Sequence, residues 1–95
     1  MKIISKFRQH TKVRLRERYG IVCNKEDLKQ MRTLILKNES IPIHKLSINV
    51  KLHLIKFEGI DIFVLYHKKY KEIITAYPQN NIFASLVQGN LVGNW

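Results

Sequence analysis

The sequence is poor in acidic residues, in cysteine and in long apolar runs. Its 95 residues include seven Asp and Glu against seventeen Lys and Arg, which gives a formal charge of +10. The single cysteine, Cys23, excludes an intramolecular disulfide and offers no spacing for a zinc site. No apolar run approaches the roughly 20 residues of a membrane span, and the apolar start at Met1–Ser5 is too short for a signal peptide. We therefore expect a protein of the reducing cytoplasm that binds no membrane.

The composition is that of one globular domain. With 45% hydrophobic and 25% charged residues the chain is apolar enough to fold, and it is too short to bury two cores. We expect a single α+β domain over residues 1–78. The segment from Pro78 to Trp95 contains no charged side chain. Residues 79–95 are predicted to form an edge strand, at Ile82–Val87, followed by a tail.

Two helices are predicted in the N-terminal part. In the first, over residues 6–19, apolar or small side chains recur every four residues, and Gly20 is suited to cap its end. This stripe consists of Phe7, Thr11, Leu15 and Tyr19. The second helix begins at Asn24, whose side chain can cap the amide of Asp27. Its buried face is expected to contain Leu28, Met31 and Ile35, with Leu34 and Leu36 broadening it.

The rest of the chain has the period of β-strands. Residues 44–54 alternate strictly between apolar and polar, which predicts one strand with His44 and His53 facing outward. Glu58-Gly59 is a tight turn, residues 60–66 read as a central strand, and residues 72–77 form a further strand that ends at Pro78. Short connections favour antiparallel pairing. The predicted fold is α+β, with two N-terminal helices packed on one face of a three- to four-stranded antiparallel sheet.

The arginines are concentrated in the first helix. Four of the five lie between positions 8 and 18, and so dense a basic helix on a small basic chain is typical of nucleic-acid binding. The residues expected to contact the phosphate backbone are Arg8, Lys12, Arg14, Arg16 and Arg18.

Three of these positions form a sharper pattern. His10, Arg14 and Arg18 are spaced by four residues, which places one imidazole and two guanidinium groups on one side of the helix. Guanidinium forks suit phosphate oxygens, and an imidazole moves a proton near neutral pH. The alternative is structural: Glu17, together with a carboxylate such as Asp61 or Glu72, pairs with these arginines at the seam between helix and sheet.

Three segments resemble a known group of proteins. His10–Gly20 resembles the opening motif, His-x3-Arg-x2-Glu-Arg-Tyr-Gly, of small phage and toxin-associated proteins. The segments 59–66 and 71–78 resemble the closing strand pair of that group, which commonly ends in an Ile-Thr-x-x-Pro-like motif. The group is similar in layout to the barnase, EndoU, colicin and RelE-like fold of metal-independent ribonucleases. The resemblance covers roughly residues 7–78.

The resemblance implies an active site at His10, Arg14 and Thr75, with Arg18 as a further phosphate contact. Cutting RNA without a metal needs a base, an acid and cations for the developing charge. His10 is the candidate base or acid, and the arginines are the charge stabilisers. Candidates for the second proton-transfer group are His67, Tyr66 and Tyr77. We expect no cofactor and no metal, because neither a metal-ligand spacing nor a Gly-rich phosphate loop is present.

Three functions therefore compete. The first is a toxin-like or phage-encoded endoribonuclease that acts on free or ribosome-associated RNA, in the host cytoplasm if a phage encodes it; the sequence leaves open whether an antitoxin is its partner. The second is a non-catalytic module that binds nucleic acid or a ribonucleoprotein. The third is a small phage protein whose basic face inhibits a host protein. The sequence leaves the oligomeric state open.

Overall fold

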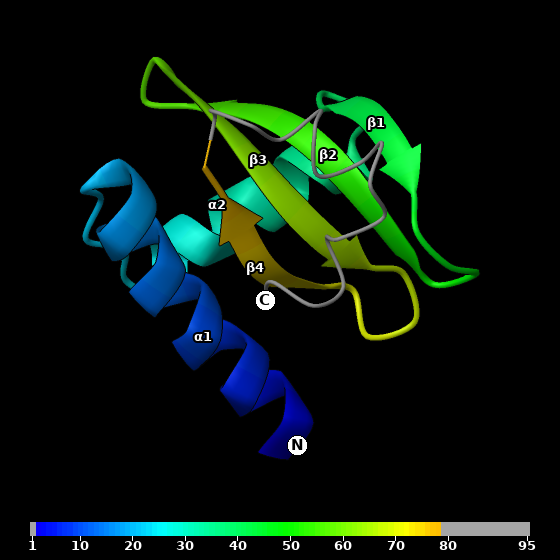
Figure 1. Cartoon of the computed structure of the whole chain (residues 1–95), viewed down its shortest axis with the longest axis horizontal. Coiled ribbons are helices and arrows are strands. Elements are labelled where there is room, and N and C mark those ends of the chain that lie inside the picture. Colours follow the sequence, from blue (N-terminus) through cyan, green and yellow to red (C-terminus); the bar gives the residue numbers. More distant parts are fainter. Residues whose placement is uncertain (1, 79–95) are drawn as a thin grey trace.

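A computed structural model of the chain describes residues 2–78. Two helices, α1 (Lys2–Tyr19) and α2 (Lys25–Leu36), precede the strands β1 (Ile41–Lys45), β2 (Val50–Phe57), β3 (Ile60–His67) and β4 (Glu72–Tyr77). The strands form one antiparallel sheet in the order β1-β2-β3-β4 (Figure 1). The predicted α+β fold class is confirmed. Neither of the two helices has the length and apolar character that crossing a bilayer requires.

Helix α2 is set by its ends and by one apolar stripe. The Asn24 side chain accepts a hydrogen bond from the amide of Asp27 at 2.8 Å, and the Asp27 carboxylate accepts one from the Asn24 amide at 3.0 Å. This reciprocal cap satisfies two amides that the helix itself leaves open. The predicted buried face, Leu28, Met31 and Ile35, is confirmed. The prediction for Leu36 is wrong: it is 56% exposed, because it lies about 100° around the helix from Ile35.

The single strand predicted over residues 44–54 is in fact a hairpin. Strands β1 and β2 are separated by a turn in which the amides of Leu46 and Ser47 both donate to the Val50 carbonyl, at 2.9 and 3.2 Å. Ile48 lies in this turn and is 80% exposed, although the alternation predicted it to be buried. The turn contains an even number of residues, so the alternation of the sequence runs through it without a break.

His53 is also misplaced by the alternation. It was predicted to face solvent, but its ring is 9% exposed and its Nδ1 lies 2.9 Å from the Ser40 hydroxyl. The reason is that β2 is covered on both faces, so that both Leu52 and His53 are buried. His44, on the edge strand β1, is exposed as predicted.

The second half of the sheet follows the sequence closely. Glu58 and Gly59 have φ values of 51° and 78° and form the two-residue turn between β2 and β3, as left-handed residues do in tight hairpins. Strand β3 is central, and five of its eight residues are buried. Strand β4 begins and ends where predicted. The fourth strand is β1, and the strand predicted at Ile82–Val87 lies outside the described residues.

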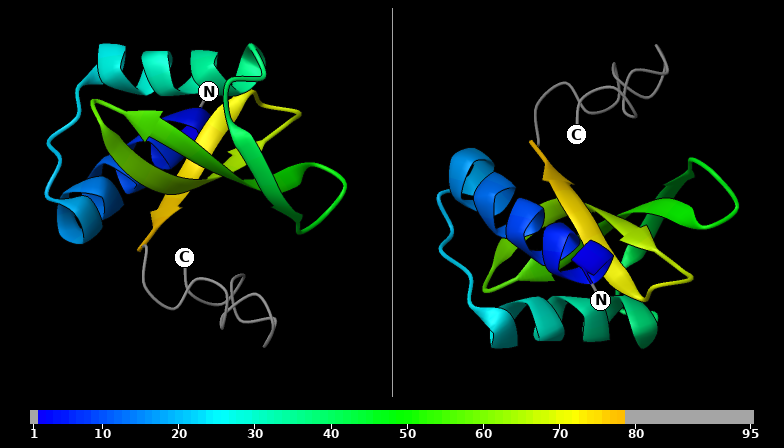
Figure 2. Two further views of the ribbon diagram at one scale, coloured as in Figure 1. Left: turned by 90° about the horizontal axis from the view of Figure 1, so that it is seen from above. Right: turned by 90° about the horizontal axis from the view of Figure 1, so that it is seen from below.

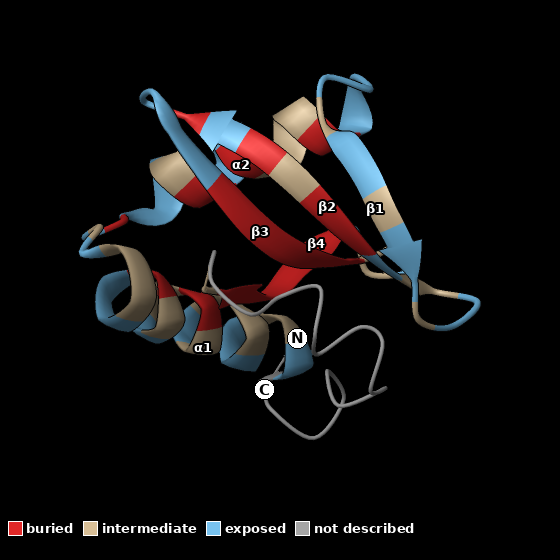
Figure 3. Ribbon diagram, turned by 45° about the horizontal axis from the view of Figure 1, so that its top comes forward, coloured by how far each residue is buried: buried red, intermediate tan, exposed pale blue. Residues whose placement is uncertain are grey.

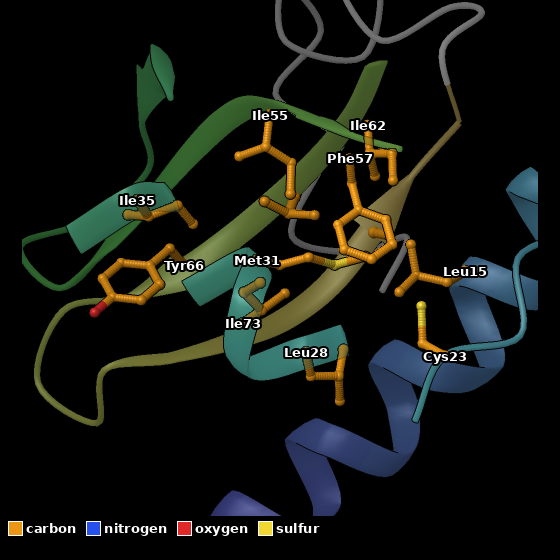
Figure 4. Close-up of a cluster of buried hydrophobic side chains, with 12 residues drawn as sticks. Leu15, Cys23, Leu28, Met31, Ile35, Ile55, Phe57, Ile62, Tyr66 and Ile73 are labelled. Atoms are coloured by element: carbon orange, nitrogen blue, oxygen red, sulfur yellow. The ribbon is translucent and has the colours of Figure 1, made fainter. Parts of the chain in front are cut away.

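The sheet separates two core clusters. The first cluster lies between the sheet and α2, and Figure 4 shows most of its members, among them Met31, Phe57 and Ile62. The second cluster lies on the opposite face and contains Leu52, Phe63, Leu65, Ile74 and Tyr77. Helix α1 runs along the edge strand β4 (Figure 2) and contributes Leu15 to the first cluster and Phe7 to the second. Only its sheet-facing side is buried (Figure 3).

Helix α1 also supplies hydrogen bonds to β4. The Thr11 hydroxyl donates to the Ile73 carbonyl at 3.0 Å, and the Arg18 guanidinium donates to the Ala76 carbonyl at 2.6 Å. The Tyr19 hydroxyl donates to the Tyr77 carbonyl and accepts from the Phe63 amide at 3.1 Å, so it bridges β3 and β4. These side chains donate hydrogen bonds to carbonyl groups of the edge strand β4 that a further β-strand would otherwise satisfy.

We predict that Thr11→Val destabilises the fold by about 1–3 kcal/mol, because it leaves the buried Ile73 carbonyl without the Thr11 donor. The matched control is Thr33→Val, which removes an exposed hydroxyl bond to the Lys29 carbonyl within α2 and is expected to change stability by less than about 0.5 kcal/mol. Urea denaturation measures both. Equal effects of the two variants would contradict the role given to Thr11.

Candidate nucleic-acid interface

Helix geometry divides the side chains of α1 between the two faces of the sheet. Leu15 belongs to the first cluster and Phe7 packs against the second, so these two residues mark the sides of α1 that face the two clusters. With a rotation of about 100° per residue, His10 and Arg14 lie on the side of α1 nearer to Phe7. Arg18 lies between the two flanks. The three cationic positions predicted from their spacing therefore border the second cluster.

Strand β4 presents two of the predicted residues to the same side. Thr75 pairs with Leu65 and Tyr77 pairs with Phe63, and both partners belong to the second cluster. The pairing shifts after Leu65, so that Ile74 is an extra residue in β4. Such a bulge re-aims neighbouring side chains and is common beside functional sites. His10 and Arg14 from α1 and Thr75 and Tyr77 from β4 thus share one side of the seam between helix and sheet.

His10 is held neutral in this position. Burial lowers its pKa below the usual 6.5, and the positive charges of Arg14 and Arg18 lower it further, while Glu17 acts weakly in the opposite sense. Its Nε2 atom is buried and has no hydrogen-bond partner in the part of the chain that the structure describes. Buried polar atoms are nearly always paired, so an atom of this kind marks a place where a ligand can supply the partner.

The two arginines are positioned by different contacts. Arg14 forms an ion pair with Glu17 at 2.8 Å on the surface of α1. The sequence analysis gave this pairing as part of the alternative in which the arginines have a structural role. Arg18 donates to the Ala76 carbonyl, and its Cζ lies 5.5 Å from the centre of the Tyr77 ring. Arg18 is therefore anchored on β4, with part of its guanidinium committed to the fold.

Strand β4 contributes one orphaned hydroxyl and one phenol. Thr75 is fully buried, and its Oγ1 has no hydrogen-bond partner among residues 2–78. Burial raises the pKa of Tyr77 to about 12, against the opposing charges of Arg18 and Arg14. At neutral pH the Tyr77 phenol is therefore protonated and can donate, whereas His10 is neutral and can accept.

Arg8 does not join this group. It donates to Glu72 at 2.8 Å, and Arg32 of α2 binds the other oxygen of the same carboxylate at 2.8 Å. The Glu72 side chain is only 3% exposed, so this triad ties α1 and α2 to the start of β4. Sequence reasoning missed Arg32, although Glu72, a carboxylate at the start of an apolar strand, was the available signal. Of the other predicted contacts, Arg16 is exposed and Lys12 is half-buried.

Of the three candidates for the second proton transfer, only Tyr66 lies on the other face of the sheet from His10, where it belongs to the first cluster. His67 stacks on Phe7 with ring centres 6.2 Å apart, one turn before His10, and its Nδ1 accepts from the Tyr70 amide at 3.3 Å. Tyr77 is the candidate whose pKa responds to Arg14 and Arg18.

Comparison with protein-family models, with curated proteins and with solved structures finds no match to this chain. The resemblance to metal-independent ribonucleases therefore stays a prediction. Over residues 2–78, no three His, Cys, Asp or Glu side chains are grouped as a metal site would require.

We predict that Arg14→Gln raises the pKa of His10 towards 6.5, because it removes a positive charge that disfavours the imidazolium. The control is Arg16→Gln, which removes the same charge from an exposed position of α1 and is expected to leave the His10 pKa nearly unchanged. NMR titration of the imidazole Cε1–H signal measures both, with the signal assigned from a His10→Asn variant. An unchanged His10 pKa in Arg14→Gln would refute the coupling.

Proposed function

We propose that this protein binds RNA along α1 and cleaves it without a metal, with His10 as the general base. The observation that carries the proposal is the buried Nε2 of His10, which lies beside two arginines and has no hydrogen-bond partner within residues 2–78. Neutral imidazole in a cationic setting is suited to take a proton from a group that a phosphate holds in place. The Thr75 hydroxyl on the neighbouring strand, which also lacks a partner in the described part of the chain, supports the same interpretation.

The positive charge of the protein attracts RNA both from a distance and in direct contact. The chain has a formal charge of +10, so a polyanion is attracted from a distance and releases counterions when it binds. At close range Arg14 offers a guanidinium fork beside His10, and its ion pair with the exposed Glu17 is a weak competitor for a phosphate. Exposed Arg16 adds attraction without taking part in the chemistry.

The proposed reaction is a transesterification. His10 takes the proton of the ribose 2′-hydroxyl, the 2′-oxygen forms a bond to phosphorus, and the bond from phosphorus to the 5′-oxygen breaks. The leaving 5′-oxygen gains a proton, so the products are a 2′,3′-cyclic phosphate and a 5′-hydroxyl. Arg14 offsets the charge on the non-bridging oxygens, and Thr75 donates a hydrogen bond to one of them.

Tyr77 is the best placed donor for the leaving oxygen. Its phenol stays protonated at neutral pH, and the nearby arginines stabilise the phenolate that the transfer creates. Tyr66 faces the other side of the sheet, and the ring of His67 contacts the rings of Phe7 and Tyr70. Cleavage of RNA requires the protein to be in a cytoplasm that contains its RNA target, free or on ribosomes.

We predict that His10→Ala lowers RNA cleavage by about 100-fold or more, the usual contribution of a general base, with little change in RNA affinity. Purified protein is incubated with total RNA in EDTA, with and without added ribosomes, and the new ends are tested for 2′,3′-cyclic phosphate. Because the pKa of His10 is lowered, the acidic limb of the rate profile is expected below pH 6.5. His44→Ala, which removes an exposed imidazole from β1, is the matched control.

The same experiment separates the competing functions. RNA that stays intact at every protein concentration, with and without ribosomes, refutes cleavage. If such RNA is nevertheless bound, and Arg14→Ala reduces the salt dependence of binding by about one unit of slope, the protein is a non-catalytic binding module. Cleavage that survives His10→Ala would place the active site elsewhere.

A further inference from the structure

A second site lies on the face of the sheet opposite Thr75. It is a cavity of about 280 Å³ between the C-terminal end of α2, the turn that joins β1 to β2, and the end of β3. None of His10, Arg14 and Thr75 lines it. Its size is at the lower end for ligand pockets, so it suits one small molecule.

The cavity has a cationic rim. Lys45, Lys51 and Lys68 come from three different segments and line it together, and no Asp or Glu is among the described residues of its wall. All three lysines are exposed, so their ammonium groups are available to an anion that enters from solvent. Three like charges around one hollow repel each other unless an anion is bound.

Tyr66 is a buried polar residue of the cavity wall whose hydroxyl lacks a partner among residues 2–78. This side chain is 7% exposed, and its hydroxyl is buried. Figure 4 shows the hydroxyl at the end of the first cluster, beside Ile35 and pointing away from Met31. Burial and the charge of Glu72 both raise the pKa of Tyr66, so the hydroxyl remains a donor. Glu72 itself is held by Arg8 and Arg32.

The remaining wall is partly apolar and includes the polar residues Ser47, Asn49 and His53. Ile35 and Val50 line the cavity from α2 and β2, and Ile48 and Leu36 line it while remaining 80% and 56% exposed. Two large apolar side chains left in water at the mouth of one pocket favour a ligand with an apolar part. The cavity therefore combines a rim of three lysines, the buried Tyr66 hydroxyl and a wall that is partly apolar.

We propose that this cavity binds a phosphate monoester that carries a flat, largely apolar group, of the size of a nucleoside monophosphate. The phosphate lies among the three lysines and accepts a hydrogen bond from Tyr66, and the flat group lies against Ile35 and Ile48. The proposal does not rest on RNA cleavage. The phosphate monoester is either a free mononucleotide or the phosphorylated end of an RNA strand, and both present the same chemistry.

Calorimetric titration of the full chain with AMP, adenosine and inorganic phosphate tests the proposal. AMP is expected to bind, and each of the other two about tenfold or more weakly, because each lacks one half of the recognised chemistry. Tyr66→Phe is expected to weaken AMP binding by about tenfold, the effect of losing a hydrogen bond to a charged group. Lys51→Gln is expected to weaken it by a smaller factor, whereas Lys56→Gln, an exposed lysine of the same strand outside the cavity, is not.

Each other outcome is decisive. Absence of AMP binding overturns the proposal, and so does phosphate that binds as tightly as AMP, since the apolar wall would then contribute nothing. AMP that binds equally to wild type, Tyr66→Phe and Lys51→Gln lies elsewhere on the protein, which also overturns it. A 5′-phosphorylated hexanucleotide serves as the second ligand: tighter binding than its unphosphorylated form, with the same response to Tyr66→Phe, identifies an RNA end as a source.

Discussion

The carbonyl groups of β4 must find hydrogen-bond donors, and α1 provides them. An edge strand with free backbone groups is costly when buried and is an aggregation hazard when exposed. Thr11, Arg18 and Tyr19 bond to the carbonyls of Ile73, Ala76 and Tyr77, at positions spread over two turns of the helix. The helix therefore cannot slide or rotate along β4 without losing several of these bonds at once. This constraint fixes the height and the rotation of every other side chain on α1.

The candidate interface is a consequence of that fixed rotation. His10 and Arg14 lie between the anchors Thr11 and Arg18 in sequence but on the flank nearer to the second cluster, where Thr75 and Tyr77 face them from β4. The fold thereby holds the His10 imidazole half-buried and near guanidinium groups, both of which lower its pKa, and leaves the Thr75 hydroxyl without a partner among the described residues. Both features cost stability. Their position on the best-anchored seam of the molecule shows how the fold tolerates that cost, because the surrounding hydrogen bonds prevent the helix from relaxing away.

The parts of the fold and of the candidate site that depend on residues close together in sequence were predictable. The cap at Asn24, the turn at Glu58-Gly59 and the limits of β4 follow from residues adjacent in sequence, and the spacing of His10, Arg14 and Arg18 placed them correctly on the border of the apolar stripe. Features that depend on pairing between strands were not predictable. The hairpin around Ile48 preserves the alternation of a single strand, and His53 is buried only because both faces of β2 are covered. The face on which Thr75 lies depends on a bulge in the pairing of β4 with β3. The hydrogen bond of Thr11 was not predictable either, because the spacing predicted that Thr11 is buried but not that its hydroxyl donates to the Ile73 carbonyl.

The distribution of charge explains why the two candidate sites differ in kind. The few carboxylates are used locally: buried Glu72 is shared by Arg8 and Arg32, and Glu17 pairs with Arg14. The lysines at the cavity rim line a wall in which no described carboxylate takes part. An anion at either site therefore supplies charge that the chain itself lacks. Salt screens the exposed ammonium groups strongly, but it has little effect on hydrogen bonds to buried atoms. Affinity that persists at high salt must then come from contacts that salt does not screen. At one site these are hydrogen bonds to the His10 imidazole and the Thr75 hydroxyl, and at the other they are the hydrogen bond to Tyr66 and the apolar contacts with Ile35 and Ile48.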